Sequence, residues 1–262
     1  MSSIDREAGS AEPQLRKYLS GDSLIVAASL ALAALLAWVW LLRSSGGAMD
    51  AMGAMAMPEP LSADYLLSAF AMWTIMMVAM MVPSAAPMFL LHARIDRTPM
   101  AAQRRLNSVL VVIGYLLVWT AFSAAAALGQ ALLVRSGLVS ATSLSLGSKP
   151  VAAVLLLAAA AYELTAAKKL CLDKCQAPML FVLKHWKPGS AGAFRLGLLH
   201  GFYCLGCCWA LMVLLFAGGV MNLAWVALLG IVVVGEKLAP PNWHANLFVA
   251  LALILGAMAV VS

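Results

Sequence analysis

The chain has 262 residues, of which 64% are hydrophobic and only 11% are charged, and its mean hydropathy is +0.94. Because soluble domains are apolar at only about half of their positions, this composition excludes an ordinary soluble protein and predicts a polytopic membrane protein. The formal net charge is +6, and the basic residues behind it are concentrated in particular loops. This distribution is typical of residues that orient a membrane protein, so the charge does not indicate a nucleic-acid partner.

The chain divides into a polar tail and one long apolar domain. Residues 1–22 mix acidic and basic side chains without an apolar face, which predicts a disordered cytoplasmic tail. A membrane span needs about 20 mainly apolar residues, and the lipid bilayer is the first expected partner. By this rule residues 23–262 predict a single all-α transmembrane bundle of about seven helices, at 24–42, 66–91, 107–134, 151–167, 196–217, 219–235 and 245–262.

The basic residues predict the orientation of this bundle. With the N-terminus in the cytoplasm, all of the 17 Lys and Arg residues except Arg43, Arg135 and Lys149 fall in cytoplasmic segments. Positive residues concentrate on the cytoplasmic side of membrane proteins, so the sequence favours a cytoplasmic N-terminus and an extracytoplasmic C-terminus. The segment 177–186 predicts a short interfacial helix at the cytoplasmic surface.

Methionine is concentrated in two places. The first is the predicted extracytoplasmic loop 43–65, which carries Met49, Met52, Met55 and Met57. The second is the span 66–91, where one face carries Met72, Met76 and Met80 and an adjacent face carries Met77 and Met81. Methionine also serves as a flexible filler between helices. Thioethers select Cu(I), however, so these residues are candidate copper ligands, with those of the loop, Met77 and Met81 as the weaker ones.

Cysteine and histidine supply a second set of candidate ligands. In the span 196–217, side chains at i, i+4, i+7 and i+8 share one helical face, and these are His200, Cys204, Cys207 and Cys208. One turn separates Cys171 from Cys175, which predicts a second, cytoplasmic pair. No cysteine is placed for an extracytoplasmic disulfide. This donor set favours Cu+ as the bound metal, with zinc or another transition metal as the alternative.

Acidic and basic groups inside an apolar span are either functional or paired. Glu163 is a weaker candidate ligand, and its alternative role is an ion pair with Lys168 or Lys169. Glu236 and Lys237 end the span 219–235 and are expected to pair with residues of another span.

Several motifs of the sequence together resemble those of a known family. They are the stretches Tyr162–Pro178, Gly197–Met212 and Gly219–Asn222, the pair Glu236-Lys237, and the opening segment from Met72 to Pro83. The chain resembles, over about residues 66–240, the predicted metal-binding integral membrane proteins of an uncharacterised bacterial domain family. This resemblance implies a metal-binding bacterial membrane protein and does not choose the metal. Copper rests on the sulfur chemistry alone.

The leading hypothesis is a non-catalytic protein of the bacterial inner membrane that binds Cu(I) and transfers it, for uptake or for supply to a copper-dependent enzyme or a metallochaperone. The first alternative is a membrane thiol–disulfide oxidoreductase that uses Cys204 and Cys207. The second is an accessory membrane subunit whose sulfur atoms only pack. Motifs for hydrolysis or nucleotide binding are missing from the sequence. The oligomeric state stays open.

Overall fold

The computed structural model describes residues 21–52, 59–140, 144, 146–240 and 244–261, and over these residues the expected all-α fold is confirmed. The helices, in chain order, are α2 Gly21–Met52, α3 Ala63–Ile95, α4 Ala101–Arg135, α5 Lys149–Glu163, α6 Ala166–Gln176, α7 Pro178–His185, α8 Gly189–Val213, α9 Leu215–Gly218, α10 Leu223–Leu238 and α11 Ala245–Val261. The short α7 lies where the interfacial helix was predicted.

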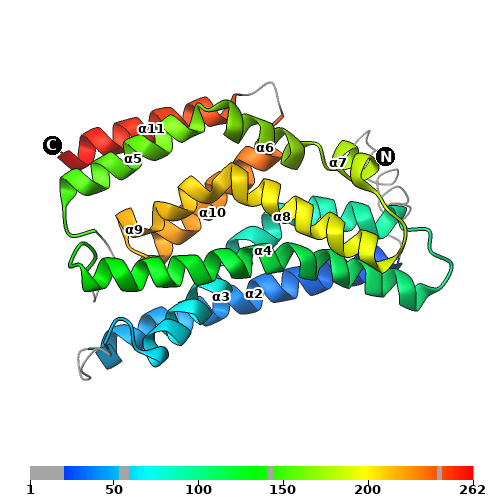
Figure 1. The fold of residues 1–262 in the computed structure, drawn as a ribbon, viewed down its shortest axis with the longest axis horizontal. Coiled ribbons are helices and arrows are strands. Elements are labelled where there is room, and N and C mark those ends of the chain that lie inside the picture. The colour runs from blue at the N-terminus through cyan, green and yellow to red at the C-terminus, as the bar shows by residue number, and fades with distance from the viewer. Residues whose placement is uncertain (1–20, 53–58, 141–143, 145, 241–243, 262) are drawn as a thin grey trace, which may run out of the picture.

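The long helices run side by side in one elongated bundle (Figure 1). Helix α4 packs against α3 and α8, α2 packs against α3, and α11 packs against α5 along one edge. Helix α10 contacts α3, α6 and α8, so it closes the space between elements that are distant in sequence. The start of α2 and the end of α11 lie at opposite ends of the bundle (Figure 1).

Four helical segments are long and apolar enough to cross a membrane, namely Ser23–Ser44, Ala63–Ile95, Ala101–Arg135 and Gly189–Gly218. Helices α5 and α6 pass the same test only together, and they are bent by 65° between them. The predicted span 151–167 therefore does not continue straight, because the helix stops at Glu163 and restarts with Thr165 as the N-cap of α6. This gives four or five spans, and the predicted count of about seven is not confirmed.

The predicted tail and the predicted Met-rich loop lie partly outside the described residues. Residues 1–20 and 53–58 belong to this part of the chain. Helix α2 already begins at Gly21, and it continues past the predicted end at residue 42 to Met52, so the first part of the predicted loop is helical. Helix α3 begins at Ala63, where Ser62 caps it by accepting a hydrogen bond from the backbone of Tyr65.

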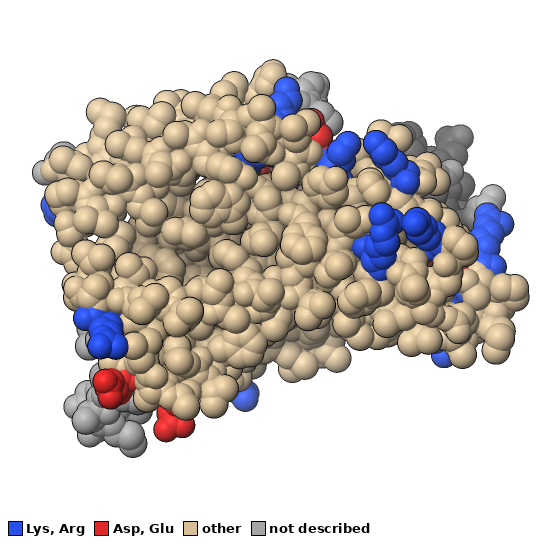
Figure 2. All heavy atoms as spheres, viewed as in Figure 1, with Lys and Arg blue, Asp and Glu red and all other residues tan. Residues whose placement is uncertain are grey.

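Basic side chains gather at the end of the bundle where α7 lies and α8 begins (Figure 2). Three chain segments that were predicted to be cytoplasmic meet there, namely the turn between α3 and α4, helix α7, and the start of α8. These segments and the helix ends beside them carry Arg94, Arg97, Arg104, Arg105, Lys184, Lys187 and Arg195. These three segments, which the sequence assigned to one side of the membrane, therefore lie at one end of the molecule.

Helices α4 and α8 approach each other closely because glycine lines their contact. A Cβ atom on Gly197 would overlap the backbone carbonyl group of Val111, and one on Gly114 would overlap that of Phe194. Small residues at helix contacts allow such close approach in membrane bundles, where van der Waals packing drives association. This contact positions α8, which carries the cysteines.

Replacing Gly197 with alanine should destabilise the bundle by about 1–3 kcal/mol, because the new methyl group meets backbone that can move only with its helix. The measurement is thermal unfolding in detergent, followed by size-exclusion chromatography. Gly256→Ala in α11 is the control, since its new methyl group would meet no atom within 4 Å among the described residues. Equal melting temperatures for the two variants would contradict the assigned packing.

Candidate metal centre

Helix α8 presents its three thiols and its imidazole to the interior of the bundle. Cys204 is 0% exposed, Cys207 and Cys208 are each 1% exposed, and His200 is 3% exposed. The i, i+4, i+7, i+8 spacing places these side chains on one face of α8, which packs against α4, α6 and α10 and contacts α3 through Met81. The thiols therefore lie in the interior of the protein, away from its surface.

Polar groups from two other helices contact Cys204, and both of them are bonded to a third helix. Its Sγ lies 2.9 Å from Nζ of Lys237 in α10 and 3.0 Å from the hydroxyl of Tyr115 in α4. The same ammonium donates to the hydroxyl of Ser84 in α3 at 2.9 Å. The hydroxyl of Tyr115 also donates to the backbone oxygen of Met81 at 3.1 Å. A cation directed at a sulfur favours the thiolate, which is the form that binds metals.

Cys207 and Cys208 point to different neighbours. The Sγ of Cys207 lies 4.0 Å from the Sγ of Cys175 in α6, and the Sγ of Cys208 lies 4.0 Å from the Sδ of Met81 in α3. Both thiols also donate to the backbone oxygen of Cys204, at 3.1 and 2.9 Å. Cys171 packs with its sulfur against Gly206, where a Cβ atom would lie 2.7 Å away. All five cysteines are unpaired as disulfides.

The sulfur–sulfur distances suit a shared ion of low coordination number. Two ligands about 2.3 Å from one metal ion, at an angle of 120°, are about 4.0 Å apart, taking the length of a zinc–thiolate bond. Among the described residues, no three His, Cys, Asp or Glu side chains meet closely enough to hold an ion. The thioether of methionine is not among these four residue types, and thiolate and thioether ligands together select Cu(I).

His200 lies one helical turn before Cys204 and is enclosed by aromatic rings. Its ring centroid is 5.7 Å from that of Tyr115 and 5.3 Å from that of Phe181. Within the described part of the chain, its Nδ1 atom has no hydrogen-bond partner. An unpartnered buried nitrogen is costly, so this atom is available to a ligand.

The methionines of α3 separate into two faces, as their spacing predicts. Met76, Met77, Met80 and Met81 are each at most 2% exposed, and Met72 is partly buried. Met80 packs against Gly230 of α10, whereas Met81 contacts Cys208. The thioether that meets the cysteines is thus one of the weaker candidates. Met49 and Met52 belong to α2 but their side chains are not described, and Met55 and Met57 lie outside the described residues.

Glu163 belongs to a buried ion network rather than to the thiol cluster. Its carboxylate pairs with Lys168, whose Nζ also lies 2.8 Å from both carboxylate oxygens of Glu236. All three side chains are at most 3% exposed. The predicted pairing of Glu163 with Lys168 is therefore confirmed, and so is the expectation that Glu236 and Lys237 bind residues of other helices.

Sequence reasoning missed two groups that surround Cys204. Tyr115 lies in the middle of an apolar helix, and no spacing rule relates it to a cysteine 89 positions later. Lys237 was recognised as a residue that needs a partner, but a lysine at the end of an apolar run does not reveal which helix it faces.

A helical bundle with membrane-compatible segments and a buried set of thiols and thioethers has the donor atoms that a protein handling a soft metal ion needs. Residues 70–261 match the sequence model of the PpoB2 copper chaperone family, and the chain belongs to this family. Family membership supports a copper-related, non-catalytic role. No curated protein and no solved structure matches the chain significantly.

Lys168→Met should destabilise the fold by about 3–5 kcal/mol, because it leaves two carboxylates buried without their shared cation. Thermal unfolding of the purified protein in detergent measures this loss. Lys169→Met removes an exposed lysine of the same helix and serves as the control. If both variants melted together, the buried network would have no structural role.

Proposed function

We propose that this protein binds Cu(I) in the bacterial inner membrane with two or three ligands at a time, drawn from Cys204, Cys207, Cys208, Cys175, His200 and Met81, and transfers it for uptake or to a copper-dependent enzyme. The observation that carries the proposal is the contact of 4.0 Å between Cys208 Sγ and Met81 Sδ. It joins the methionine helix to the thiol helix inside the protein. Membership in the copper chaperone family supports copper as the cargo.

Charge balance supports monovalent copper at this place. Cu(I) with two thiolates carries one net negative charge, which is costly in an interior of low dielectric constant. The ammonium of Lys237, 2.9 Å from Cys204 Sγ, supplies one positive charge and makes the assembly neutral. A divalent ion with two thiolates is already neutral, so the lysine would then leave an excess positive charge.

A transfer path fits the order of ligands along α3. Met72, Met76 and Met80 follow one another at one-turn intervals, and the neutral thioethers bind more weakly than the anionic thiolates. Copper would therefore gain affinity on passing from the methionines of α3 to the cysteines of α8. We further propose seven passes with a cytoplasmic N-terminus, in which α5 with α6, α10 and α11 complete the bundle. The basic end seen in Figure 2 is then the cytoplasmic one.

The copper site is tested by metal analysis of protein purified anaerobically in detergent. The wild type should carry close to one equivalent of copper, and Cys204→Ser/Cys208→Ser should lose nearly all of it because both central thiolates are removed. Cys171→Ser should keep it, since that sulfur packs against Gly206. Met81→Leu should weaken Cu(I) binding, whereas Met179→Leu, at an exposed methionine, should not.

A different result would identify a different class of protein. Wild-type protein free of metal, with a reversible Cys204–Cys207 disulfide, would contradict the copper proposal and favour the thiol oxidoreductase. If the wild type contained zinc in place of copper, and the same cysteine variant lost that zinc, the proposed site would be correct but the bound metal would be zinc.

The role of Lys237 gives a separate prediction. Lys237→Met should weaken Cu(I) binding by about tenfold to a hundredfold, which corresponds to the loss of one charge-assisted hydrogen bond. Competition with a chromophoric Cu(I) chelator measures the affinity. Lys237→Arg keeps the charge and should lie between the wild type and the methionine variant. Equal affinities for all three would show that the ammonium does not balance the bound ion.

A further inference from the structure

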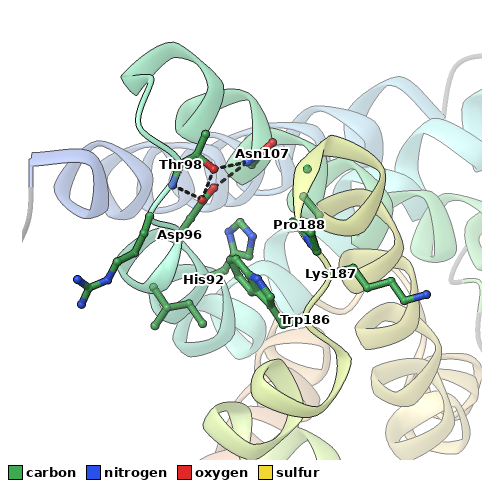
Figure 3. Close-up of a pocket in the computed structure, with 11 residues that line it drawn as sticks. His92, Asp96, Thr98, Asn107, Trp186, Lys187 and Pro188 are labelled. Carbon is green, nitrogen blue, oxygen red and sulfur yellow. Dashed lines mark hydrogen bonds between the residues drawn. The ribbon is translucent and has the colours of Figure 1, made fainter.

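A pocket outside the thiol cluster opens at the basic end of the bundle (Figure 3). Its volume is about 350 Å³, and it lies between the end of α3, the start of α4 and the segment that joins α7 to α8. His92, Asp96 and Trp186 line it, with Arg97 and Lys187 at the same site. The proposed copper site leaves this pocket without a role.

His92 is the chemically distinctive group of the pocket. It is 2% exposed, and its ring packs on Trp186 at a centroid distance of 5.2 Å. Among the described residues, Nδ1 of His92 has no hydrogen-bond partner. Buried polar atoms are nearly always paired in proteins, so this imidazole nitrogen has a lone pair or a proton to offer a ligand at the pocket.

Asp96 supplies a fixed negative charge one turn further along the chain. Its carboxylate accepts hydrogen bonds from the backbone and hydroxyl of Thr98, at 3.0 and 2.6 Å, and from the side chain of Asn107 at 2.8 Å (Figure 3). Burial alone would raise the pKa of Asp96, but these hydrogen bonds more than offset it and hold the pKa below its usual value. The carboxylate can therefore favour a cation at the pocket without moving.

The same face of α3 connects the pocket with the thiol cluster. Met81, Met88 and His92 are separated by seven and four residues, so they share one face of the helix, and each is at most 2% exposed. From His92 to Met81 the helix rises about 16 Å. Met81 is the residue that contacts Cys208.

Helix α8 leads inward from the same pocket. Ala193 lines the pocket, His200 lies two turns deeper, and Cys204 lies one turn beyond His200. In the described part of the chain, the buried histidine nitrogens without a hydrogen-bond partner are Nδ1 of His92 and Nδ1 of His200. Both of them lie on helices that run from the pocket to the thiols.

We propose that the pocket is the port through which copper is exchanged with the aqueous phase, and that His92 is the ligand that receives or releases the Cu(I) ion there. This inference rests on the proposed function and adds its point of entry or exit. In the exchange, the lone pair of His92 Nδ1 forms a bond to Cu(I) while one ligand of the donor complex leaves with its own electron pair. Copper stays monovalent, and no electron is transferred.

The rim of the pocket indicates the chemical class of the exchange partner. The exposed side chains of Arg97 and Lys187 disfavour the approach of a free cation and favour an anionic complex. Cu(I) held by thiolates or by a carboxylated chelator is such a complex.

The test follows copper uptake from the anionic Cu(I)–bicinchoninate complex into full-length protein in detergent, by stopped-flow absorbance. His92→Phe keeps an aromatic ring on Trp186 and removes both ring nitrogens. In this variant the copper uptake rate should fall by about tenfold or more. The final copper content should fall by a smaller factor than the rate. His185→Phe is the control, because His185 packs on Phe181 at 4.7 Å and is not part of the pocket lining.

X-ray absorption of copper-loaded protein gives a readout that does not depend on rate. The Cys204→Ser/Cys208→Ser protein, which is purified without copper, is given Cu(I) in excess, and copper at the port should then show an imidazole ligand that disappears when His92→Phe is added. His200→Phe in the same background separates the two buried histidines. The port would then be detected even if the thiol cluster were not the copper site, so failure of one proposal is distinguishable from failure of the other.

Two results would overturn the port. One is an uptake rate in His92→Phe equal to that in His185→Phe. The other is that inorganic phosphate binds at the pocket equally in the wild type and in His92→Phe, while the variant does not change the copper uptake rate. That result would identify the pocket as an anion site formed by Arg97 and Lys187.

Discussion

The ammonium of Lys237 joins the helices that carry the thiol cluster. From α10 it reaches Ser84 of α3 and Cys204 of α8, each at 2.9 Å, and it is only 6% exposed. A buried lysine without anionic or polar partners would be too costly to keep its charge, so the fold requires the groups around it to accept hydrogen bonds or carry negative charge. Ser84 and Cys204 meet this requirement by accepting its hydrogen bonds. The stability of the bundle and the position of the cysteine thus depend on the same contact.

Helix α10 links this cluster to the second polar cluster of the interior. Glu236 and Lys237 are adjacent in sequence, yet Glu236 reaches Lys168 of α6 and Lys237 reaches α8. Side chains at consecutive positions of a helix point about 100° apart, so one turn of α10 serves both clusters. Glu236 and Lys237 therefore each pair with a residue of another helix instead of pairing with each other. Moving α10 relative to α8 would therefore disturb the ion network and the thiols together.

Much of this arrangement could be predicted from the sequence because long apolar segments leave few alternatives to helices. Apolar length predicted the helices, and the 3.6-residue period predicted that His200, Cys204 and Cys208 share a face. The bend after Glu163 was missed, because the apolar composition continues through it while the cap at Thr165 starts a new helix. The choice of Met81 over Met80 was also missed. Periodicity defines the faces of a helix, but only the packing of α10 against one face and α8 beside the other decides which face meets sulfur.

The two ends of the proposed route place different demands on their ligands. At the thiol cluster the ion is enclosed, so anionic sulfur with a fixed counter-charge gives tight binding and neutrality at once. At the pocket the ion must be released again, and a neutral imidazole holds Cu(I) less firmly than a thiolate does. The unpartnered nitrogen of His92 belongs to the pocket, and that of His200 lies between the pocket and the thiols, on helices that also carry Met81 and Cys204. A graded series of ligands lets an ion move in small steps of free energy, which a single strong site at the surface would prevent.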